Sequence, residues 1–517
     1  MRVPLTTADF LDRAETVFAD RIGVVDEPSQ PAPSLGQVTY GTVAARARAI
    51  AAGLDELGVD EGERVAVVSE NSARLLELIL GVTAAGRVCV PVNFRLQPGE
   101  VEYIIEHSGA SVLLLDPEHD ERLSHLSAKH RFVFGDEYES GLLRPGREPR
   151  AWSQPDEDAT ATINYTSGTT ARPKGVQLTH RNLWVNAVTF GWHLGVSERD
   201  VYLHTLPMFH CNGWGMPFAT AAMGVPQIVL RKVDGTEILR RIQQHGITLA
   251  CGAPAVWNAV LDAAAAWDGE IPGSGTMRVV VAGAPPPTRT IARIETELGW
   301  QFNQIYGLTE TSPLLTVNRP RAEWDDLSPD ERARRLGRAG APSIGTRLRI
   351  GESGEVLARS NTVLAGYWQQ PEETSASLAD EGAAGPEFHT GDGGTLSDDG
   401  YLTISDRKKD IIITGGENVS SIEVEDAVFN HPSVAEVAVI GVPDERWGET
   451  IKALVVAAPD VEVTEAEIIA WCKERLARYK APTSVDFVES IPRTATGKVQ
   501  KFRIRAPYWE GRERTVN

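Results

Sequence analysis

The chain has 517 residues, of which 42% are hydrophobic and 24% are charged, and its formal net charge at pH 7 is −20. This composition is typical of a globular protein, and the length predicts more than one domain. The negative charge argues against nucleic acid or an anionic membrane as the main partner. A site for a polyanion must therefore be made locally, from backbone N–H groups, a metal ion and a few cations.

Cysteine usage and hydropathy favour a cytoplasmic protein. Cys89, Cys211, Cys251 and Cys472 are scattered, with no pair at metal-ligand or disulfide-framework spacing. The N-terminal segment has no apolar signal core, and no window approaches the length of a membrane-spanning helix. We therefore expect a soluble cytoplasmic protein without integral membrane association, and the sequence leaves assembly as a homodimer open.

The first half of the chain alternates helix-like and strand-like segments. Residues 44–57 are alanine-rich and helical in composition, and residues 64–69 form a short apolar run. Helical periodicity returns over residues 73–85, before a second apolar run at residues 88–92. Strand, helix, strand at this spacing predicts parallel sheets covered by helices. Further strands are expected at residues 112–116, 227–230, 248–251 and 278–282.

The chain changes character in its second half. Residues 322–338 are densely charged and predict a surface excursion, and shorter strands are expected at residues 354–358 and 400–404. A separately patterned unit with the strand and helix signals of a small α+β domain follows residue 410. The predicted fold is α/β: a large N-terminal domain of parallel-type sheets covered by helices plus a β-rich subdomain (residues 1–406), a hinge (residues 407–410), and a small mobile α+β C-terminal domain (residues 411–517).

The segment YTSGTTARPKGV, residues 165–176, carries the strongest chemical signal. Its small and hydroxyl-bearing residues let backbone N–H and side-chain O–H groups surround phosphate oxygens, and Lys174 adds a positive charge. The spacing is not that of a Walker A loop, and a polar surface loop is the alternative reading of such a segment taken alone. The expected phosphate ligands besides Lys174 are Thr166, Ser167, Gly168, Thr169 and Thr170.

The order of these residues matches the phosphate-loop signature of the adenylate-forming enzymes, with Ala171 where a glycine is commoner. A second segment, NQIYGLTET at residues 303–311, resembles the second signature of that family. The resemblance implies that Tyr306 stacks on adenine, Thr309 touches the α-phosphate and Glu310 binds Mg²⁺, for which a carboxylate is a suitable hard ligand. It also places Gln304, Ile305 and Gly307 at the nucleotide, and Thr166 beside Glu310 at the metal.

Three further segments match the family in the same order along the chain. Gly283, Ala284 and Pro285 follow a predicted strand and resemble the segment that lies along adenine in relatives. Asp392, in a Thr-Gly-Asp motif, is expected to accept both ribose hydroxyls. The segment DRKKD at residues 406–410 implies that Arg407 reaches the ribose and that Lys409 is the hinge residue.

The last motif is PRTATGKVQK at residues 492–501, in which Lys498 corresponds to the lysine that reaches the substrate carboxylate and the α-phosphate. Together the motifs resemble the acyl-CoA synthetase, luciferase and peptide-synthetase adenylation superfamily, and most closely its fatty-acid and carboxylate–CoA ligases. The resemblance implies an ATP-dependent enzyme that uses Mg²⁺ and CoA. It also implies that the small domain rotates about Lys409 to present Gly415, Gly416 and Glu417 to CoA.

The segment LPMFHCNGW, residues 206–214, corresponds to the acyl pocket of these enzymes. The resemblance implies that His210 guards the entry of the acyl group, with Trp214 and Gly307 at the substrate. Amino-acid-activating relatives have an aspartate after the phenylalanine, whereas His210 follows Phe209 here, so an α-amino acid is disfavoured. The expected substrate is an aromatic or a short-to-medium aliphatic carboxylic acid, and core packing is the alternative role for Trp214.

Several alternatives remain open at this point. The acyl group could pass to a carrier protein acting in trans or to a nucleophile other than a thiol, and the enzyme could activate a small oxyanion such as nitrite. A luciferase-like oxidase has no independent support in the sequence. A catalytically silent nucleotide-binding protein is disfavoured, because Glu310 and Lys498, the predicted catalytic residues with Thr166 and His210, are all present.

Overall fold

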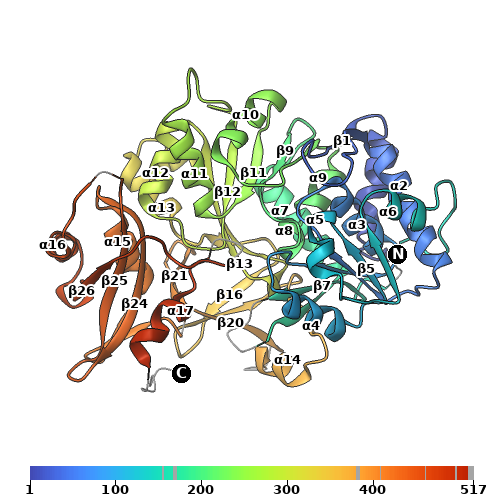
Figure 1. Ribbon diagram of the computed structural model, residues 1–517. Helices are drawn as coiled ribbons and strands as arrows, with labels where there is room; N and C mark the ends of the chain where they lie inside the picture. The colour runs from blue at the N-terminus through green and yellow to red at the C-terminus, as the bar shows by residue number, and fades with distance from the viewer. Residues whose placement is uncertain are drawn as a thin grey trace.

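The structure is a computed structural model (Figure 1), which describes residues 1–153, 156–166, 172–379, 385–407, 409–459, 461–494 and 498–510. Their strands form two large sheets and two smaller ones. The α/β class predicted from the sequence is confirmed. In the described residues no helix is long and apolar enough to cross a membrane.

The larger sheet has nine strands in the order β15-β14-β13-β12-β11-β9-β10-β1-β2. Its central strands, from β1 through β13, pair in parallel, whereas the edge strands β2, β14 and β15 are antiparallel. The bounds are β1 Ile22–Val25, β2 Gln37–Thr39, β9 Tyr202–His204, β10 Gln227–Val229, β11 Leu249–Gly252, β12 Arg278–Val281, β13 Gln301–Gly307, β14 Leu314–Asn318 and β15 Ala341–Pro342. The strands expected near residues 227, 248 and 278 are therefore confirmed.

The second sheet has seven strands in the order β18-β8-β7-β4-β3-β5-β6. Strands β7, β4, β3, β5 and β6 run in parallel, and β8 returns antiparallel to β7, which places the ends of the predicted phosphate loop side by side. The bounds are β3 Arg64–Val68, β4 Val88–Val92, β5 Val112–Leu115, β6 His130–Val133, β7 Thr160–Thr166, β8 Lys174–Thr179 and β18 Gly366–Tyr367.

Helices cover both sheets, as the alternating pattern predicted. Helix α3 (Ala73–Ala84) is buried along its whole length and begins where the Ser72 side chain accepts a hydrogen bond from Leu75 N. The other helices of this part are α1 Ala8–Phe18, α2 Tyr40–Glu56, α4 Pro98–Ser108, α5 Pro117–Asp120, α6 Asp136–Gly141, α7 His180–Leu194, α8 Cys211–Trp214, α9 Met216–Ala222, α10 Gly235–His245, α11 Pro254–Ala264, α12 Thr288–Glu297, α13 Pro329–Leu336 and α14 Pro371–Ser377.

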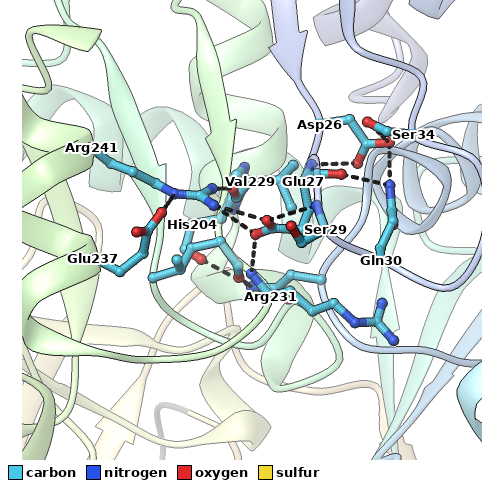
Figure 2. A network of polar contacts seen from close by, with 12 residues as sticks. Asp26, Glu27, Ser29, Gln30, Ser34, His204, Val229, Arg231, Glu237 and Arg241 are labelled. Atoms are coloured by element: carbon cyan, nitrogen blue, oxygen red, sulfur yellow. Dashed lines mark hydrogen bonds and ion pairs between the residues drawn. The ribbon is translucent and has the colours of Figure 1, made fainter. Parts of the chain in front are cut away.

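A network of buried charges ties the two large sheets together, as Figure 2 shows in part. Both carboxylate oxygens of Glu27, just after β1, accept hydrogen bonds from Arg241 on α10 at 2.9 Å. Glu27 also accepts from the backbone N–H of Arg231, whose guanidinium bonds Asp116 after β5 at 2.7 and 3.0 Å. The carboxyl ends of strands from both sheets are thereby held at one place.

A smaller antiparallel sheet follows, formed by β16 Arg347–Ile350, β17 Glu355–Arg359, β19 Leu378–Ala379, β20 Glu387–Leu396 and β21 Leu402–Arg407. The surface excursion expected at residues 322–338 is only partly correct. This segment contains α13, and Trp324, Ala333 and Leu336 are buried in a core cluster. The many charged residues of this segment obscured the pattern of an amphipathic helix in the sequence.

The C-terminal part has its own sheet and its own hydrophobic cluster. In Figure 1 it lies, in orange and red, beside α12 and α13. Its elements are β22 Ile412–Thr414, β23 Glu417–Val419, α15 Ser421–Phe429, β24 Val434–Asp444, β25 Gly448–Ala457, α16 Glu465–Arg475, β26 Ser484–Phe487 and α17 Lys501–Arg505. The elements expected after residue 410 are therefore present, and the boundary at residues 407–410 remains a prediction.

Candidate active site

Strands from two different sheets meet at a pair formed by a half-buried tyrosine and a buried aspartate. The hydroxyl of Tyr306, on β13, donates a 2.8 Å hydrogen bond to Asp392 Oδ2 on β20. Arg407 Nε, at the end of β21, lies 3.6 Å from Asp392 Oδ1. Burial raises the pKa of Asp392, while the positive charges of Arg407 and Lys498 oppose that shift. Burial also raises the pKa of Tyr306 far above its ordinary value, so its hydroxyl stays a donor.

Lys498 enters this cluster from the C-terminal part of the chain. Its Cε lies 3.8 Å from the position that a Cβ on Gly283 would occupy, and Gly283 has a φ of +89°. Burial is the largest cause that lowers the pKa of Lys498, followed by repulsion from Arg407, while Asp392 and Glu310 oppose the shift. The Lys498 ammonium therefore lies among charges of both signs. They include Asp392, the predicted ribose ligand, and Glu310, the predicted metal ligand.

Glu310 lies in a short 3₁₀ turn, Thr309–Thr311, directly after β13. Its Oε1 accepts a 3.0 Å hydrogen bond from the hydroxyl of Tyr367 on β18. The ammonium of Lys174 lies 5.2 Å from the centroid of the Tyr367 ring and pairs with Glu373. Tyr367 thus connects Glu310 to the end of the predicted phosphate loop. Neither Tyr367 nor Glu373 was identified as a site residue from the sequence.

The predicted phosphate loop is only partly described. Thr166 ends β7 and is paired in register with Lys174 at the start of β8. Ser167, Gly168, Thr169 and Thr170 lie outside the described residues. The two described ends of the loop are therefore adjacent, and one of them lies beside Tyr367 and Glu310.

His210 lies on the segment that the sequence predicts to line the acyl pocket. Burial, together with the nearby Lys498 ammonium, lowers the pKa of His210 to about 3, so the imidazole is neutral near pH 7. The next residue, Cys211, has its Sγ 4.0 Å from the carbonyl oxygen of Thr309. Trp214 is 3% exposed and packs in the main core. Cys211 was not identified from the sequence, which offers no motif for a lone cysteine.

The remaining predicted nucleotide ligands lie on β13 and after β12. Once its amide is oriented so that nitrogen faces these acceptors, Gln304 donates to the carbonyls of Leu336 and Arg338 at 2.8 and 3.3 Å, and Ile305 packs in the core. A Cβ on Gly307 would lie 1.5 Å from the Pro313 carbonyl oxygen, so only glycine fits there. Ala284 and Pro285 follow β12 and Gly283, and Pro285 is exposed.

The predicted hinge and CoA residues lie on the C-terminal part. Gly415 and Gly416 have φ values of 60° and 86°, and Gly415 N donates to the Trp447 carbonyl at 2.8 Å. Glu417 is exposed. The Gly415–Trp447 bond runs within the C-terminal part, and a Cβ on Gly416 would meet no atom within 4 Å. Burial lowers the pKa of Lys409, and its carbonyl accepts from Arg505.

The donor set fits a nucleoside triphosphate with Mg²⁺. Asp392 offers a buried carboxylate that can accept hydrogen bonds from the ribose hydroxyls. Gly283 has no side chain, so its backbone is accessible to a ligand. Lys174 and Lys498 supply positive charge for the phosphates. No group of three or more His, Cys, Asp or Glu side chains that could hold a metal occurs in the described residues. A single carboxylate such as Glu310 suits Mg²⁺, which keeps several waters and otherwise binds substrate phosphates.

Comparison with known proteins agrees with this reading. Residues 11–368 match the model of the AMP-binding enzyme family, and residues 423–498 match that of the AMP-binding enzyme C-terminal domain. A 2-methylpropanoate–CoA ligase of Humulus lupulus is 37% identical, over 97% of this chain and 95% of the relative. A 4-hydroxybutyrate–CoA ligase of Metallosphaera sedula is 35% identical, over 97% and 94%. The crystal structure of an anthranilate CoA ligase with anthranoyl-AMP superposes with a TM-score of 0.86 at 26% identity, covering 98% of both chains.

Proposed function

Because the chain belongs to the AMP-binding enzyme family and is an AMP-forming acid–thiol ligase that uses ATP, Mg²⁺ and CoA, we propose that it activates a short aliphatic carboxylic acid. Two relatives at 35% identity or more act, by their names, on four-carbon acids, 2-methylpropanoate and 4-hydroxybutyrate. The buried Trp214 and the neutral His210 favour an acyl group over a charged amino acid. An aromatic acid is the second candidate, because of the likeness to the anthranilate ligase.

The observation that carries the proposed site is that the half-buried Lys498 lies within electrostatic range of both the buried Asp392 and the half-buried Glu310. In this proposal Tyr306 stacks on adenine, and Asp392 with Arg407 binds the ribose. Lys498 orients the acid's carboxylate toward the α-phosphorus. Mg²⁺ on Glu310 neutralises phosphate charge when bound.

The first half-reaction follows from this placement. A carboxylate oxygen attacks the α-phosphorus in line, the bond to the β-phosphate oxygen breaks, and pyrophosphate leaves. The protein positions two anions and balances the charge that develops, without a covalent enzyme intermediate. The phosphate loop from Thr166 to Lys174 and the Lys498 ammonium serve this role.

In the second half-reaction the CoA thiolate attacks the acyl carbonyl, and AMP leaves. We propose that residues 411–517 rotate on the hinge at residues 407–410, withdrawing Lys498 and presenting Gly415, Gly416 and Glu417 to the pantetheine arm. Glycines at this turn allow a narrow arm to pass close to the backbone. Hinge motion of this kind is common in enzymes whose domains close around a ligand.

A pyrophosphate-release screen tests the proposal. Purified protein with ATP and Mg²⁺ is offered aliphatic acids of two to eight carbons, aromatic acids and nitrite, with and without CoA, and acyl-CoA is detected by mass. Release that is strongest with acids of about four carbons, with the matching acyl-CoA, is expected. Activation without acyl-CoA formation would favour a carrier protein in trans or another nucleophile. Failure to form AMP with any acid would contradict the assignment.

The location and assembly of the protein stay predictions. Cell fractionation tests the cytoplasmic location expected from the sequence. Light scattering tests whether the chain forms a homodimer.

A further inference from the structure

The turn that follows His210 has an unusual backbone. Five consecutive residues have positive φ: Cys211 at 45°, Asn212 at 51°, Gly213 at 59°, Trp214 at 60° and Gly215 at 79°. The element labelled α8 is therefore a left-handed turn. Residues with a Cβ rarely adopt this conformation, because the Cβ crowds the carbonyl oxygen. Such conformations persist where the surroundings enforce them, often at functional sites.

A buried amide pair holds the centre of this turn. Asn212 Nδ2 donates to Asn164 Oδ1 on β7, and Asn164 Nδ2 donates back to Asn212 Oδ1, both at 3.2 Å. Asn212 Nδ2 also bonds Thr162 Oγ1 at 3.0 Å. The three side chains are at most 2% exposed. Since buried amides without partners are unfavourable, this reciprocal arrangement fixes both side chains.

A second buried asparagine holds the end of the turn. Asn186 Nδ2, on α7, donates to the Trp214 carbonyl at 3.2 Å, and Asn186 Oδ1 accepts from Leu314 N at 3.2 Å. A Cβ on Gly215 would lie 2.5 Å from Asn186 Nδ2, so the turn and this amide fit only with glycine there. Asn186 therefore joins the turn to the strand that begins shortly after Glu310.

These contacts connect three parts of the proposed site. Asn164 lies two residues before Thr166, where the phosphate loop begins. Leu314 N, bonded to Asn186, lies four residues after Glu310. His210 directly precedes the turn itself. We propose that Asn164, Asn212 and Asn186 are positioning residues that fix His210 and Trp214 relative to the nucleotide site, and thereby determine which acids the pocket accepts.

This inference rests on the proposed function, and the test separates the two. Asn212→Ala and Asn164→Ala are compared with wild type for the KM of the acid, the KM of ATP, and kcat/KM for the preferred acid and for one a carbon longer. We expect the acid's KM to rise roughly tenfold, the size expected from the loss of a buried hydrogen bond, with the ATP KM within about twofold. The ratio of kcat/KM between the two acids should change by several-fold. Because Asn164 and Asn212 bond each other, the acid's KM in the double variant should be no higher than in the single variants.

A third test variant and a control complete the set. Asn212→Gly keeps a backbone suited to the left-handed turn but lacks the amide, so it tests the contact if the alanine variants do not fold. Asn318→Ala removes a fully buried asparagine that bonds three carbonyls near α13, and should lower Tm without altering acid preference. Equal changes in both KM values, or an unchanged preference in Asn212→Ala, Asn212→Gly and Asn164→Ala alike, would overturn the inference. A wild-type protein inactive with every acid would overturn the proposed function as well.

Discussion

The Lys498 ammonium is attracted by Asp392 and Glu310 and repelled by Arg407, and burial favours its uncharged form. Such a side chain is costly to hold in place unless a bound anion uses its charge. The proposed reaction supplies that anion in the carboxylate and the α-phosphate. The same residue gives two predictions, one on half-reactions and one on pH.

Lys498→Ala should lose roughly 10²-fold or more in adenylation, the scale of one transition-state charge contact. Thioester formation from supplied acyl-AMP should be largely retained, because the proposed domain rotation withdraws Lys498 in that step. Rapid-quench assays of each half-reaction measure this. Lys473→Ala, which removes an exposed lysine on α16, should alter neither step. Equal loss in both half-reactions would contradict the two-state assignment.

The lowered pKa of Lys498 predicts a fall in the adenylation rate at alkaline pH, the alkaline limb of the pH–rate profile. An amine is charged below its pKa, so activity that needs the ammonium falls as pH rises through that lowered pKa, sooner than for an ordinary lysine. Lys498→Arg should remove this limb, because a guanidinium stays charged. The rate of pyrophosphate release is measured against pH in both proteins. An identical limb in the arginine variant would assign it to another group.

Tyr306 should act on the nucleotide alone. Tyr306→Phe keeps the ring but removes the 2.8 Å bond to Asp392, so the KM of ATP should rise by roughly tenfold, as for loss of a hydrogen bond to a charged group. The KM of the acid should be unchanged. Tyr508→Phe removes a similar bond, to Asp486 at 2.6 Å in the C-terminal part, and is the control. A change in the acid's KM only would place Tyr306 in the acyl pocket.

At the scale of the elements, buried charges rather than apolar contacts alone join β1, β10 and α10. Glu27 and Arg241 are 5% and 7% exposed and bond each other through both carboxylate oxygens. Removing one partner of such a pair leaves the other charge buried, which is more destabilising than the pair is stabilising.

Glu27→Gln should therefore lower the free energy of unfolding by about 3 kcal/mol. Arg240→Ala, which removes an exposed ion pair with Glu237 on the same helix, should change it by less than about 1 kcal/mol. Urea unfolding followed by circular dichroism measures both. Similar midpoints for the two variants would mean that the Glu27–Arg241 pair is not critical for the joined sheets.

At the scale of the whole molecule, a contact between the proposed domains holds the C-terminal part where Lys498 reaches the site. Helix α12 begins after Pro287, which offers no side-chain cap. Asp426, on α15, accepts hydrogen bonds from Thr288 N at 2.9 Å and Thr288 Oγ1 at 3.0 Å. Asp426 therefore caps the N-terminus of α12 from the other part of the chain.

Asp426→Ala should disfavour this orientation by about 1 kcal/mol, the usual value of a cap, and slow pyrophosphate release by about fivefold. Thioester formation from supplied acyl-AMP should not be slowed. Asp234→Ala removes the cap of α10 within the N-terminal part, and should lower Tm without changing the ratio of the two half-reactions. The same ratio in both variants would show that the cap has no role in domain orientation.

The sequence alone determined the features that repeat or stay local. Apolar runs and helical periodicity are set by neighbours in the chain, so β3, β4, α2 and α3 were predicted close to their bounds. The family motifs, which are contiguous segments, likewise indicated ATP, Mg²⁺ and CoA. The helix within residues 322–338 was missed because charge dominates its composition, while only a few of its side chains face the core.

The contacts between distant segments became evident only in the folded structure. Tyr367 bonds Glu310 across 57 residues, and Asn164 bonds Asn212 across 48. Neither pair has a local signature, because a tyrosine or an asparagine is acceptable in many contexts until folding fixes its neighbour. The left-handed turn after His210 was also beyond sequence reasoning, since Cys211 and Trp214 disfavour positive φ by themselves. Its conformation comes from the buried amides packed around it, which exist together only in the folded chain.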